Sequence, residues 1–360
     1  MRFGIFTLIE TRDGDHQAAY KEVMGQVEYA EELGFDNVWL AEHHGSHYGS
    51  MPSPQIFAAA AARATERIRI GAAVSVLPFA NPVRVAEDWA MVDVLSNGRL
   101  DLGVGRGYQP PEYAMLGLTE RQPVSRKVFR ESLDILIGLY ENETFSYQGE
   151  FYSIEDVSIT PRPVQRPRPP IFVAALSPGT FDLMGEYGLD GMALVGLEPL
   201  DVVMDHVLKA KRDLAARGLD AAALRYPLFC LTALGHTKDA AIQKIAPALQ
   251  WHFTTAAQIF PGGSTHAAPE GYEFFAQQFA AGASATVDDL LGSGLFLAET
   301  AEGMCSVVER ARTTIGQNEM TLHFRFGGMP DKDVRESMKI FAEEVMPQFK
   351  EKQGDLPGGF

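Results

Sequence analysis

The sequence has only two cysteines in 360 residues, Cys230 and Cys305. Two cysteines are too few for a disulfide framework, and their spacing is not that of a metal site. Positive charge is also scarce, because 31 Lys and Arg residues face 47 Asp and Glu residues and leave a formal net charge of −16. A strongly negative chain is a poor partner for nucleic acid or an anionic membrane surface, so we expect neither.

Long apolar runs and flexible linkers are missing as well. No stretch is apolar for long enough to span a bilayer, and Met1 is not followed by the apolar core of a secretion signal. We therefore expect a cytoplasmic protein that does not contact membranes. Because 46% of the residues are hydrophobic and no Ser- or Gly-rich linker divides the chain, residues 1–360 are expected to fold as one domain.

Short apolar runs alternate with segments of helical periodicity along most of the chain. Several runs are apolar nearly throughout, which is typical of parallel strands covered by helices. Eight such units, the last followed by a helix over Val334–Phe349, predict a (β/α)8 (TIM) barrel rather than an open doubly wound sheet. The expected strands are Phe3–Leu8, Asn37–Ala41, Ile68–Leu77, Leu100–Val104, Ile171–Ala175, Gly191–Val195, Pro227–Leu234 and Thr321–Phe326.

Two segments are too long to be simple connections. Glu141–Pro170 is rich in proline and predicts a small hairpin with an extended approach to the fifth strand. Ile259–Leu297 contains several glycines and follows the seventh strand and its helix. A segment of this length is usually a functional lid or a poorly ordered loop, and at this place in a barrel it would lie over the C-terminal mouth.

The second expected strand ends in Glu42-His43-His44, where a barrel places its catalytic groups. Neighbouring residues of an extended segment point in opposite directions, so the two imidazoles are not expected to chelate one metal ion. We expect no metal site and interpret the pair as supplying a catalytic or hydrogen-bonding histidine at the mouth. A histidine with a purely structural role is the alternative.

Two further strand ends suit an anion. Arg106 follows the fourth strand in a glycine-rich turn, and Ser177-Pro178-Gly179-Thr180 begins the helix after the fifth strand. Ser177 suits a helix N-cap, where free amides and the positive end of the helix attract phosphate. Neither feature is specific alone, since glycine-rich turns and helix caps are common. Together, on adjacent strands, they predict a phosphate site.

Other strand ends are less informative. Ala72-Ala73-Val74-Ser75 ends the third strand with side chains small enough for a flat ring to lie against the backbone. Near the last strand, His323 and Arg325 either line the mouth or belong to the core. No Rossmann fingerprint, P-loop or nucleophile elbow is present in the sequence.

Taken together, these motifs resemble the bacterial luciferase-like flavin-dependent monooxygenases, and among them the catalytic subunit of bacterial luciferase. The resemblance covers the chain nearly from end to end, in consistent order and spacing. The segments that carry it are Met1–Phe6, Gly34–His44, Asn81–Arg84, Leu95–Arg99, Gly103–Gly107, Ser337–Phe341 and Val345–Pro347.

This resemblance implies an enzyme with FMN, as FMNH2, for its diffusing co-substrate, supplied by a separate NAD(P)H:flavin reductase. The reduced flavin reacts with O2 at its C4a atom, and the resulting peroxide oxygenates an organic substrate. The resemblance also implies a homodimer, with interface helices near Pro54–Ala64 and Pro82–Leu95.

The resemblance further assigns roles to single residues. His43 matches the histidine that moves a proton at the flavin peroxide. Arg106, Ser177 and Thr180 match the phosphate grip, and the insertion matches the family's mobile lid. The peptide between Ala73 and Val74 matches a non-prolyl cis bond that supports the flavin ring.

Two positions depart from the luciferases. Gly105 stands where they have a reactive cysteine, and Leu176 stands where they have a glutamate of the phosphate site, so that only its backbone N–H is left to bind. These departures favour a monooxygenase that emits no light. An F420-dependent oxidoreductase on the same barrel and a non-catalytic flavin-binding subunit are the alternatives, and the sequence does not identify the organic substrate.

Overall fold

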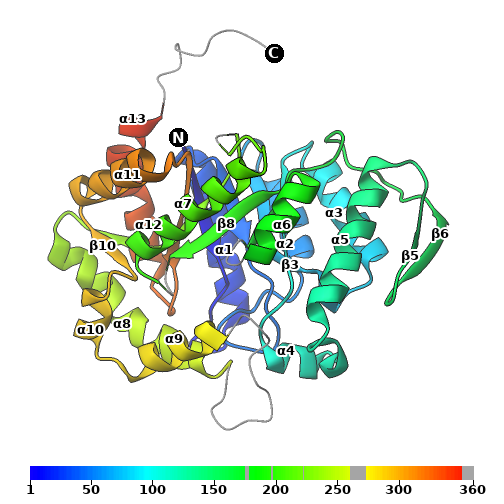
Figure 1. Ribbon diagram of the computed structural model, residues 1–360. Coiled ribbons are helices and arrows are strands. Elements are labelled where there is room, and N and C mark those ends of the chain that lie inside the picture. The colour runs from blue at the N-terminus through cyan, green and yellow to red at the C-terminus, as the bar shows by residue number, and fades with distance from the viewer. Residues whose placement is uncertain (175–177, 196–197, 222, 260–272, 351–360) are drawn as a thin grey trace.

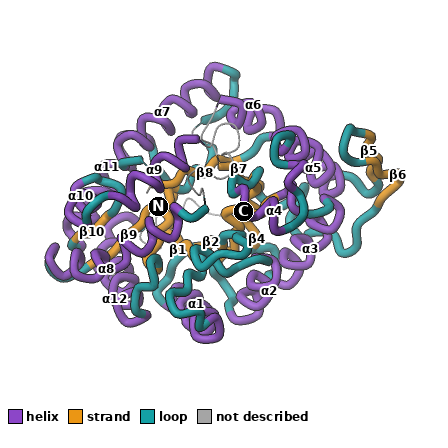
Figure 2. The backbone as a smooth tube through the Cα atoms, turned by 90° about the horizontal axis from the view of Figure 1, so that it is seen from below, coloured by secondary structure: helices purple, strands orange, loops and turns teal. Residues whose placement is uncertain are grey.

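Eight parallel strands form a closed ring, with helices packed around it (Figures 1 and 2). The structure is a computed structural model that describes residues 1–174, 178–195, 198–221, 223–259 and 273–350. Strands pair in the order β9-β11-β1-β2-β3-β4-β7-β8, and pairing of β8 with β9 closes the ring. This confirms the predicted (β/α)8 barrel and excludes the open sheet. The barrel strands are β1 Arg2–Thr7, β2 Asn37–Leu40, β3 Arg69–Val76, β4 Leu100–Gly105, β7 Ile171–Ala174, β8 Asp190–Val195, β9 Leu228–Leu234 and β11 Glu319–Arg325.

The helices that surround the ring begin where the sequence provides caps. Asp15 accepts a hydrogen bond from the Ala18 N–H at the start of α1, and Asn81 caps α3 with Pro82 in its first turn. None of the described helices is long and apolar enough to cross a membrane. The surrounding helices are α1 His16–Glu32, α2 Pro54–Ala64, α3 Pro82–Leu95, α5 Ser125–Glu141, α6 Pro178–Tyr187, α7 Leu200–Ala216, α8 Lys238–Ala257, α11 Ala301–Ile315 and α12 Asp331–Ile340.

The last helix differs from the prediction. A continuous helix was expected over Val334–Phe349, but α12 ends at Ile340 and a π-helical turn spans Phe341–Val345 before the short helix α13, Met346–Phe349. A π-turn adds one residue to a helical turn without breaking its apolar face, so the sequence pattern is nearly unchanged. The barrel-facing side chains of Phe341 and Val345 are fully buried.

The two insertions have regular structure. The first forms the predicted hairpin, with β5 Phe145–Gln148 and β6 Ser153–Val157, which extends away from the barrel (Figures 1 and 2). In the second, residues 260–272 lie outside the described residues. The rest is helical rather than loop, and ends in a strand beside β9: α9 Glu273–Ser284, α10 Val287–Gly292 and β10 Leu297–Glu299.

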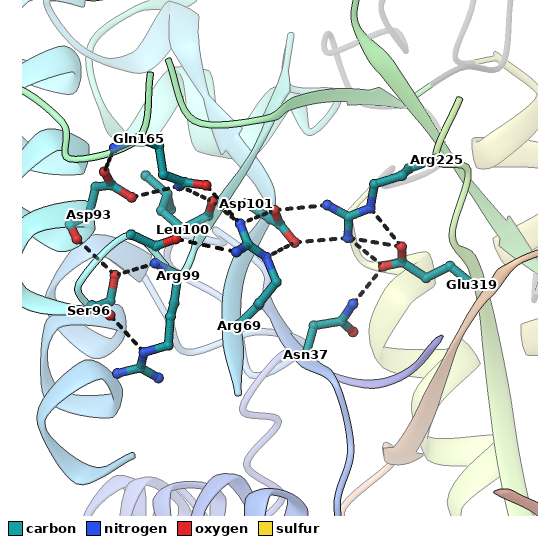
Figure 3. Close-up of polar contacts among 11 residues, drawn as sticks. Asn37, Arg69, Asp93, Ser96, Arg99, Leu100, Asp101, Gln165, Arg225 and Glu319 are labelled. Atoms are coloured by element: carbon teal, nitrogen blue, oxygen red, sulfur yellow. Dashed lines mark hydrogen bonds and ion pairs between the residues drawn. The ribbon is translucent and has the colours of Figure 1, made fainter. Parts of the chain in front are cut away.

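Charged side chains close the N-terminal end of the barrel (Figure 3). Arg225 lies between two carboxylates: its Nη1 and Nη2 are each 3.0 Å from an Asp101 oxygen, and its Nε is 3.0 Å from Glu319 Oε2. Arg69 also contacts Asp101, and Asn37 donates to Glu319. Burial alone would raise the pKa of Asp101, but the charges of Arg225 and Arg69 outweigh it and lower the pKa.

Aromatic side chains fill the layer above these charges. The Arg225 guanidinium stacks on the Phe172 ring at 4.7 Å, and Phe172 packs edge-on against Trp39 at 5.0 Å. Phe229 and Met192 complete this cluster inside the ring. The inside of the ring is therefore filled at its base and middle, and the cavity within the ring lies above the aromatic layer.

Candidate active site

A cavity opens at the C-terminal ends of the strands, with an empty volume of about 1130 Å³ that includes its mouth. Most of its walls are apolar, which is typical of a site for an organic cofactor or substrate. Small residues on β2, β3, β4 and β7 leave room on one side: Ala41, Ala73, Gly105 and Ala174. Larger apolar side chains from β1, β8 and β9 form the floor and the other side: Phe6, Met192, Leu194, Phe229 and Leu231.

His43 lies in this wall just after β2 and is almost fully buried. Its backbone N–H donates to the Met51 carbonyl at 3.1 Å. Gly49 packs directly on the imidazole, because a Cβ at that position would be 2.8 Å from His43 Cβ and Cδ2. The loop after β2 therefore fixes the ring in place.

Two side chains from the loop after β4 reach Nδ1 of His43. Glu112 Oε1 is 3.1 Å away and Gln109 Nε2 is 2.8 Å away. The two contacts make opposite demands on Nδ1, because the Glu112 carboxylate accepts a hydrogen bond and the Gln109 amide nitrogen donates one. The tautomer with the hydrogen on Nδ1 satisfies Glu112, and it also suits Gln109 when the amide is turned so that its oxygen faces Nδ1. Nε2 is then the nitrogen left for chemistry, and none of the described residues hydrogen-bonds to it. This pattern suits a general acid–base group.

His44 faces a different partner. Its Nε2 is 3.2 Å from Glu42 Oε1, while Glu42 Oε2 accepts the Val76 N–H at 2.9 Å. Burial raises the pKa of Glu42. Burial alone would lower the pKa of His44, but the hydrogen bond and the charge of Glu42 outweigh this effect and raise the pKa of His44. The two histidines therefore turn to separate carboxylates. No cluster of three His, Cys, Asp or Glu side chains suited to a metal occurs in the part of the chain that is described.

The predicted phosphate residues are only partly described. Arg106 is half-buried, lines the cavity and has its backbone carbonyl held by the Tyr113 hydroxyl at 2.6 Å. Thr180 lies in the first turn of α6, which follows β7, and β7 pairs directly with β4. Arg106 and Thr180 therefore follow two adjacent strands. Leu176 and Ser177 lie outside the described residues.

Ala73 and Val74 also line the cavity, and the peptide bond between them is cis. Opposite them, a Cβ at Gly105 would lie 2.3 Å from Val74 Cγ2. A cysteine at position 105, as in the luciferases, would thus require Val74 to move. The packing of Val74 against this position therefore agrees with a glycine at 105.

His323 and Arg325, whose place the sequence left open, belong mainly to the core. His323 packs edge-on against Phe6 at 4.9 Å, and burial lowers its pKa to about 3, so the ring is neutral. Arg325 is buried and donates to the Glu10 carbonyl at 3.0 Å and to Glu22 at 3.2 Å. Neither residue lines the main cavity.

Several polar residues that line the cavity or contact His43 were not predicted from the sequence. Gln109 and Glu112 flank the start of α4, Pro110–Met115, directly after the glycine-rich turn that contains Arg106. A carboxylate in the first helical turn beyond a barrel strand end is a signal that points to the mouth. Tyr48, Tyr108 and His252 also line the cavity. His252 gave no such signal, because it lies more than halfway along α8.

Several proteins that are similar to the chain in sequence are monooxygenases by name. The chain is 31% identical to the oxygenase component of flavin-dependent trigonelline monooxygenase of Acinetobacter baylyi. The match covers 57% of this chain and 58% of that protein. The chain is 27% identical to the alpha chain of alkanal monooxygenase of Photorhabdus luminescens over 99% of both chains. It is 38% identical over 50% of its length to the uncharacterized protein y4vJ of Sinorhizobium fredii, and spans about half of that protein (51%).

Solved structures share the barrel. The monooxygenase RslO1 of Streptomyces bottropensis superimposes with a TM-score of 0.80 at 25% identity, covering 97% of this chain and 100% of that one. The oxygenating constituent of 3,6-diketocamphane monooxygenase of Pseudomonas putida, in complex with FMN, gives 0.74 at 18% identity, with 97% and 98% covered. An F420-dependent secondary alcohol dehydrogenase gives 0.72 at 19% identity, with 97% and 99% covered. The last two show the fold alone.

The family model described as luciferase-like monooxygenase matches residues 1–316, which include all of the barrel strands but the last. The matched region contains His43 and the glycine-rich turn with Arg106, which line the cavity. By this match and by its barrel, the chain belongs to the luciferase-like monooxygenases.

Proposed function

We propose that the chain is the oxygenase of a two-component system, using FMNH2 from a separate NAD(P)H:flavin reductase and O2 to oxygenate an organic substrate. The observation that carries this proposal is the buried imidazole of His43, with Nδ1 held by Glu112 and Nε2 without a described partner, in the wall of an apolar cavity. The oxygenase component of trigonelline monooxygenase is a relative that is consistent with a separate reductase.

The residues present fit FMN. A flat ring fits on the side of the cavity where Ala73, Gly105 and Ala174 have small side chains or none. Arg106 and Thr180, which follow adjacent strands, would hold the phosphate together with Ser177 and the Leu176 N–H. The Ala73–Val74 peptide would support the ring. When bound, reduced FMN supplies the two electrons that activate O2.

The chain itself then has three tasks. The apolar walls exclude water from the reaction. Arg106 neutralises the phosphate and fixes the orientation of the ring. His43 moves one proton through Nε2, while Glu112 keeps the hydrogen on Nδ1 and stabilises the imidazolium that forms. A non-catalytic subunit would have no need of the Glu112 and Gln109 contacts to this imidazole.

An anaerobic titration with FMNH2 and, separately, with reduced F420 tests the proposed function. We expect FMNH2 to bind and, after mixing with oxygenated buffer, to give a transient flavin–oxygen spectrum. Binding of reduced F420 with no binding of FMNH2 would instead assign hydride-transfer chemistry. Binding of FMNH2 with no reaction with O2 would favour the non-catalytic flavin-binding subunit.

The Arg106→Met variant is expected to bind FMN about 10–100-fold more weakly, because a charge-assisted contact to the phosphate is lost. Riboflavin has no phosphate, so its affinity should be unchanged. Quenching of flavin fluorescence measures both. Arg312→Met, which removes an exposed arginine paired with Glu309 on α11, is the control. Equal weakening of FMN and riboflavin would show that Arg106 does not bind the phosphate.

We further propose a homodimer through α2 and α3. Four apolar residues on these helices are exposed, among them Ile56 at 73% and Val94 at 43%, beside Met91 and Leu95. The double variant Ile56→Glu/Val94→Glu is expected to sediment as a monomer where the parent chain sediments as a dimer. Val202→Glu, an exposed position on α7, is the matched control. A monomeric parent chain would contradict the proposal.

The second insertion, residues 259–297, is proposed to cover the mouth of a single domain spanning residues 1–360. Phe279 of α9 supports this, because its ring lines the cavity and lies 6.2 Å from that of Tyr48. Cytoplasmic location and the absence of light emission likewise stay predictions.

A further inference from the structure

A second imidazole in the cavity is held by a carboxylate in the same way as His43. His252 is 5% exposed and lines the cavity, and its Nδ1 is 2.7 Å from Glu10 Oε1. The Glu10 side chain is fully buried, and its other oxygen accepts the Gly327 N–H. Each carboxylate oxygen therefore accepts a hydrogen bond, so that rotation of the Glu10 carboxylate would break both.

The atoms around His252 define its tautomer. Glu10 is an acceptor, so the hydrogen of the neutral imidazole lies on Nδ1 and Nε2 carries a lone pair. None of the described residues hydrogen-bonds to Nε2, and that nitrogen is not among the buried polar atoms that lack a partner. Nε2 is thus accessible from the cavity and able to accept a proton.

The second pair lies across the mouth from the first. Glu10 follows β1, Gly327 follows β11 and His252 is on α8, whereas the partners of His43 come from the loop after β4. In Figures 1 and 2, α8 and α4 lie on opposite sides of the barrel. Tyr48 separates the two imidazoles, with ring centroids 5.3 Å from His43 and 5.4 Å from His252.

The titratable groups near His252 include, besides Glu10, His323, Tyr48 and Arg325. His323, the other imidazole close to it, is neutral because burial lowers its pKa to about 3. Burial also raises the pKa of Tyr48 well above its usual value, so this neighbour is an uncharged phenol. Arg325 is the nearby cation, and its guanidinium is engaged by the Glu10 carbonyl and Glu22.

Aromatic and aliphatic side chains surround the rest of this side of the cavity. Phe279 of α9 lines it above, and Phe229 and Leu231 of β9 line it below. His252 itself packs edge-on against Phe253 and Phe326. The neighbouring Tyr48 hydroxyl is hydrogen-bonded to Tyr108, so a ligand here meets Nε2 of His252 as its proton acceptor in a largely apolar, ring-lined space. Such a space suits an aromatic molecule with a single hydroxyl group.

We infer that His252 is a second catalytic residue, which binds the hydroxyl of a phenolic substrate through Nε2 and removes its proton. The inference rests on the proposed oxygenation, for which His43 and the flavin occupy the β2–β4–β7 side of the cavity. The phenol O–H bond breaks and an N–H bond forms at Nε2. The products are a phenolate and an imidazolium, whose charge Glu10 balances. The phenolate ring is richer in electrons than the phenol and is a better acceptor of an electrophilic oxygen atom.

Three naphthalene derivatives of similar shape distinguish binding by hydrogen-bond donation, binding by hydrogen-bond acceptance and binding by shape alone. 2-Naphthol donates a hydrogen bond, 2-methoxynaphthalene only accepts one, and 2-methylnaphthalene does neither. We expect the full chain to bind 2-naphthol about tenfold more tightly than either of the other two, the value of one hydrogen bond to a buried group. The absorption spectrum of bound naphthol should also shift toward that of naphtholate, which reports the proton transfer without any turnover.

The His252→Asn variant isolates Nε2. Asparagine can still donate to Glu10 from the position of Nδ1, but it has no atom at the position of Nε2. We expect the preference for 2-naphthol to fall to within about twofold and the naphtholate spectrum to disappear, with the affinity for 2-methylnaphthalene unchanged. His47→Asn, at an exposed imidazole outside the cavity, is the control and should behave like the parent chain.

Each other outcome overturns the inference. Equal affinity for the three probes, tighter binding of 2-methoxynaphthalene, binding of none of them, or a preference that survives in His252→Asn would each exclude a proton-accepting His252. The titrations are made on the chain alone and again with oxidised FMN. If the chain bound no flavin but still preferred 2-naphthol, the proposed function would be overturned and the role of His252 would stand. If the chain bound flavin but showed no preference for 2-naphthol, the role of His252 would be overturned and the proposed function would stand.

Discussion

Replacing His43 with alanine should slow product formation by about 10²–10⁴-fold, the usual contribution of a general acid–base group. The affinity for FMNH2 should change by less than about threefold, because the phosphate and ring contacts lie on other residues. The physical reason is the buried Nδ1–Glu112 contact, which leaves Nε2 to handle the proton in a dry cavity. Stopped-flow mixing of the anaerobic flavin complex with O2 and substrate measures the rate, and flavin titration measures the affinity.

Two variants accompany this measurement. Glu112→Gln keeps the size of the side chain but removes its charge, so it should lower the rate less than His43→Ala and shift its pH profile. His47→Ala, an exposed histidine in the same loop, should leave rate and affinity unchanged. Loss of FMNH2 affinity in His43→Ala, together with an unchanged yield of product per O2, would show that His43 binds the flavin and does not move the proton.

Replacing Arg225 with methionine should lower the free energy of unfolding by about 3–5 kcal/mol, because two buried carboxylates lose their shared cation. Asp101 and Glu319 are both nearly inaccessible to solvent. With Arg225 present, the pKa of Asp101 is lowered, so its negative charge is favourable in the folded state. Without it, Asp101 keeps its ion pair with Arg69, and Glu319 keeps its hydrogen bond from the amide of Asn37. Urea unfolding followed by circular dichroism measures the change.

A triple variant tests the cause of this loss. Arg225→Met/Asp101→Asn/Glu319→Gln removes the cation and both charges together, and it should recover a large part of the stability. Arg67→Met, at an exposed arginine before β3, is the control and should change the free energy of unfolding by less than about 0.5 kcal/mol. If Arg225→Met were as stable as the parent chain, the carboxylates of Asp101 and Glu319 would take up protons or water in the folded state at no cost in free energy.

The sequence was sufficient for the barrel because apolar runs and helical periodicity are local patterns. All eight barrel strands begin and end within two residues of their expected bounds. The interruption of the last helix at Phe341–Val345 was missed, because a π-turn changes backbone hydrogen bonds without changing the order of apolar side chains. The helices of the second insertion were missed because its glycines favour loops.

The candidate site was predictable where its residues lie at strand ends. His43, Arg106 and the Ala73–Val74 pair all line the cavity. The partners of the imidazoles were not predictable, since each comes from a distant loop: Glu112 is 69 residues from His43, and Glu10 is 242 residues from His252. Which loops meet depends on the order of strands in the ring and on the length of each connection. No local pattern carries that information.

The ion pairs at the base of the barrel also determine from which end a ligand can reach the cavity. Because Arg225 and its partners close that end beneath a layer of packed rings, a ligand of the cavity enters and leaves through the opposite, C-terminal end of the barrel. A molecule bound near that opening would therefore slow the exchange of one bound deeper.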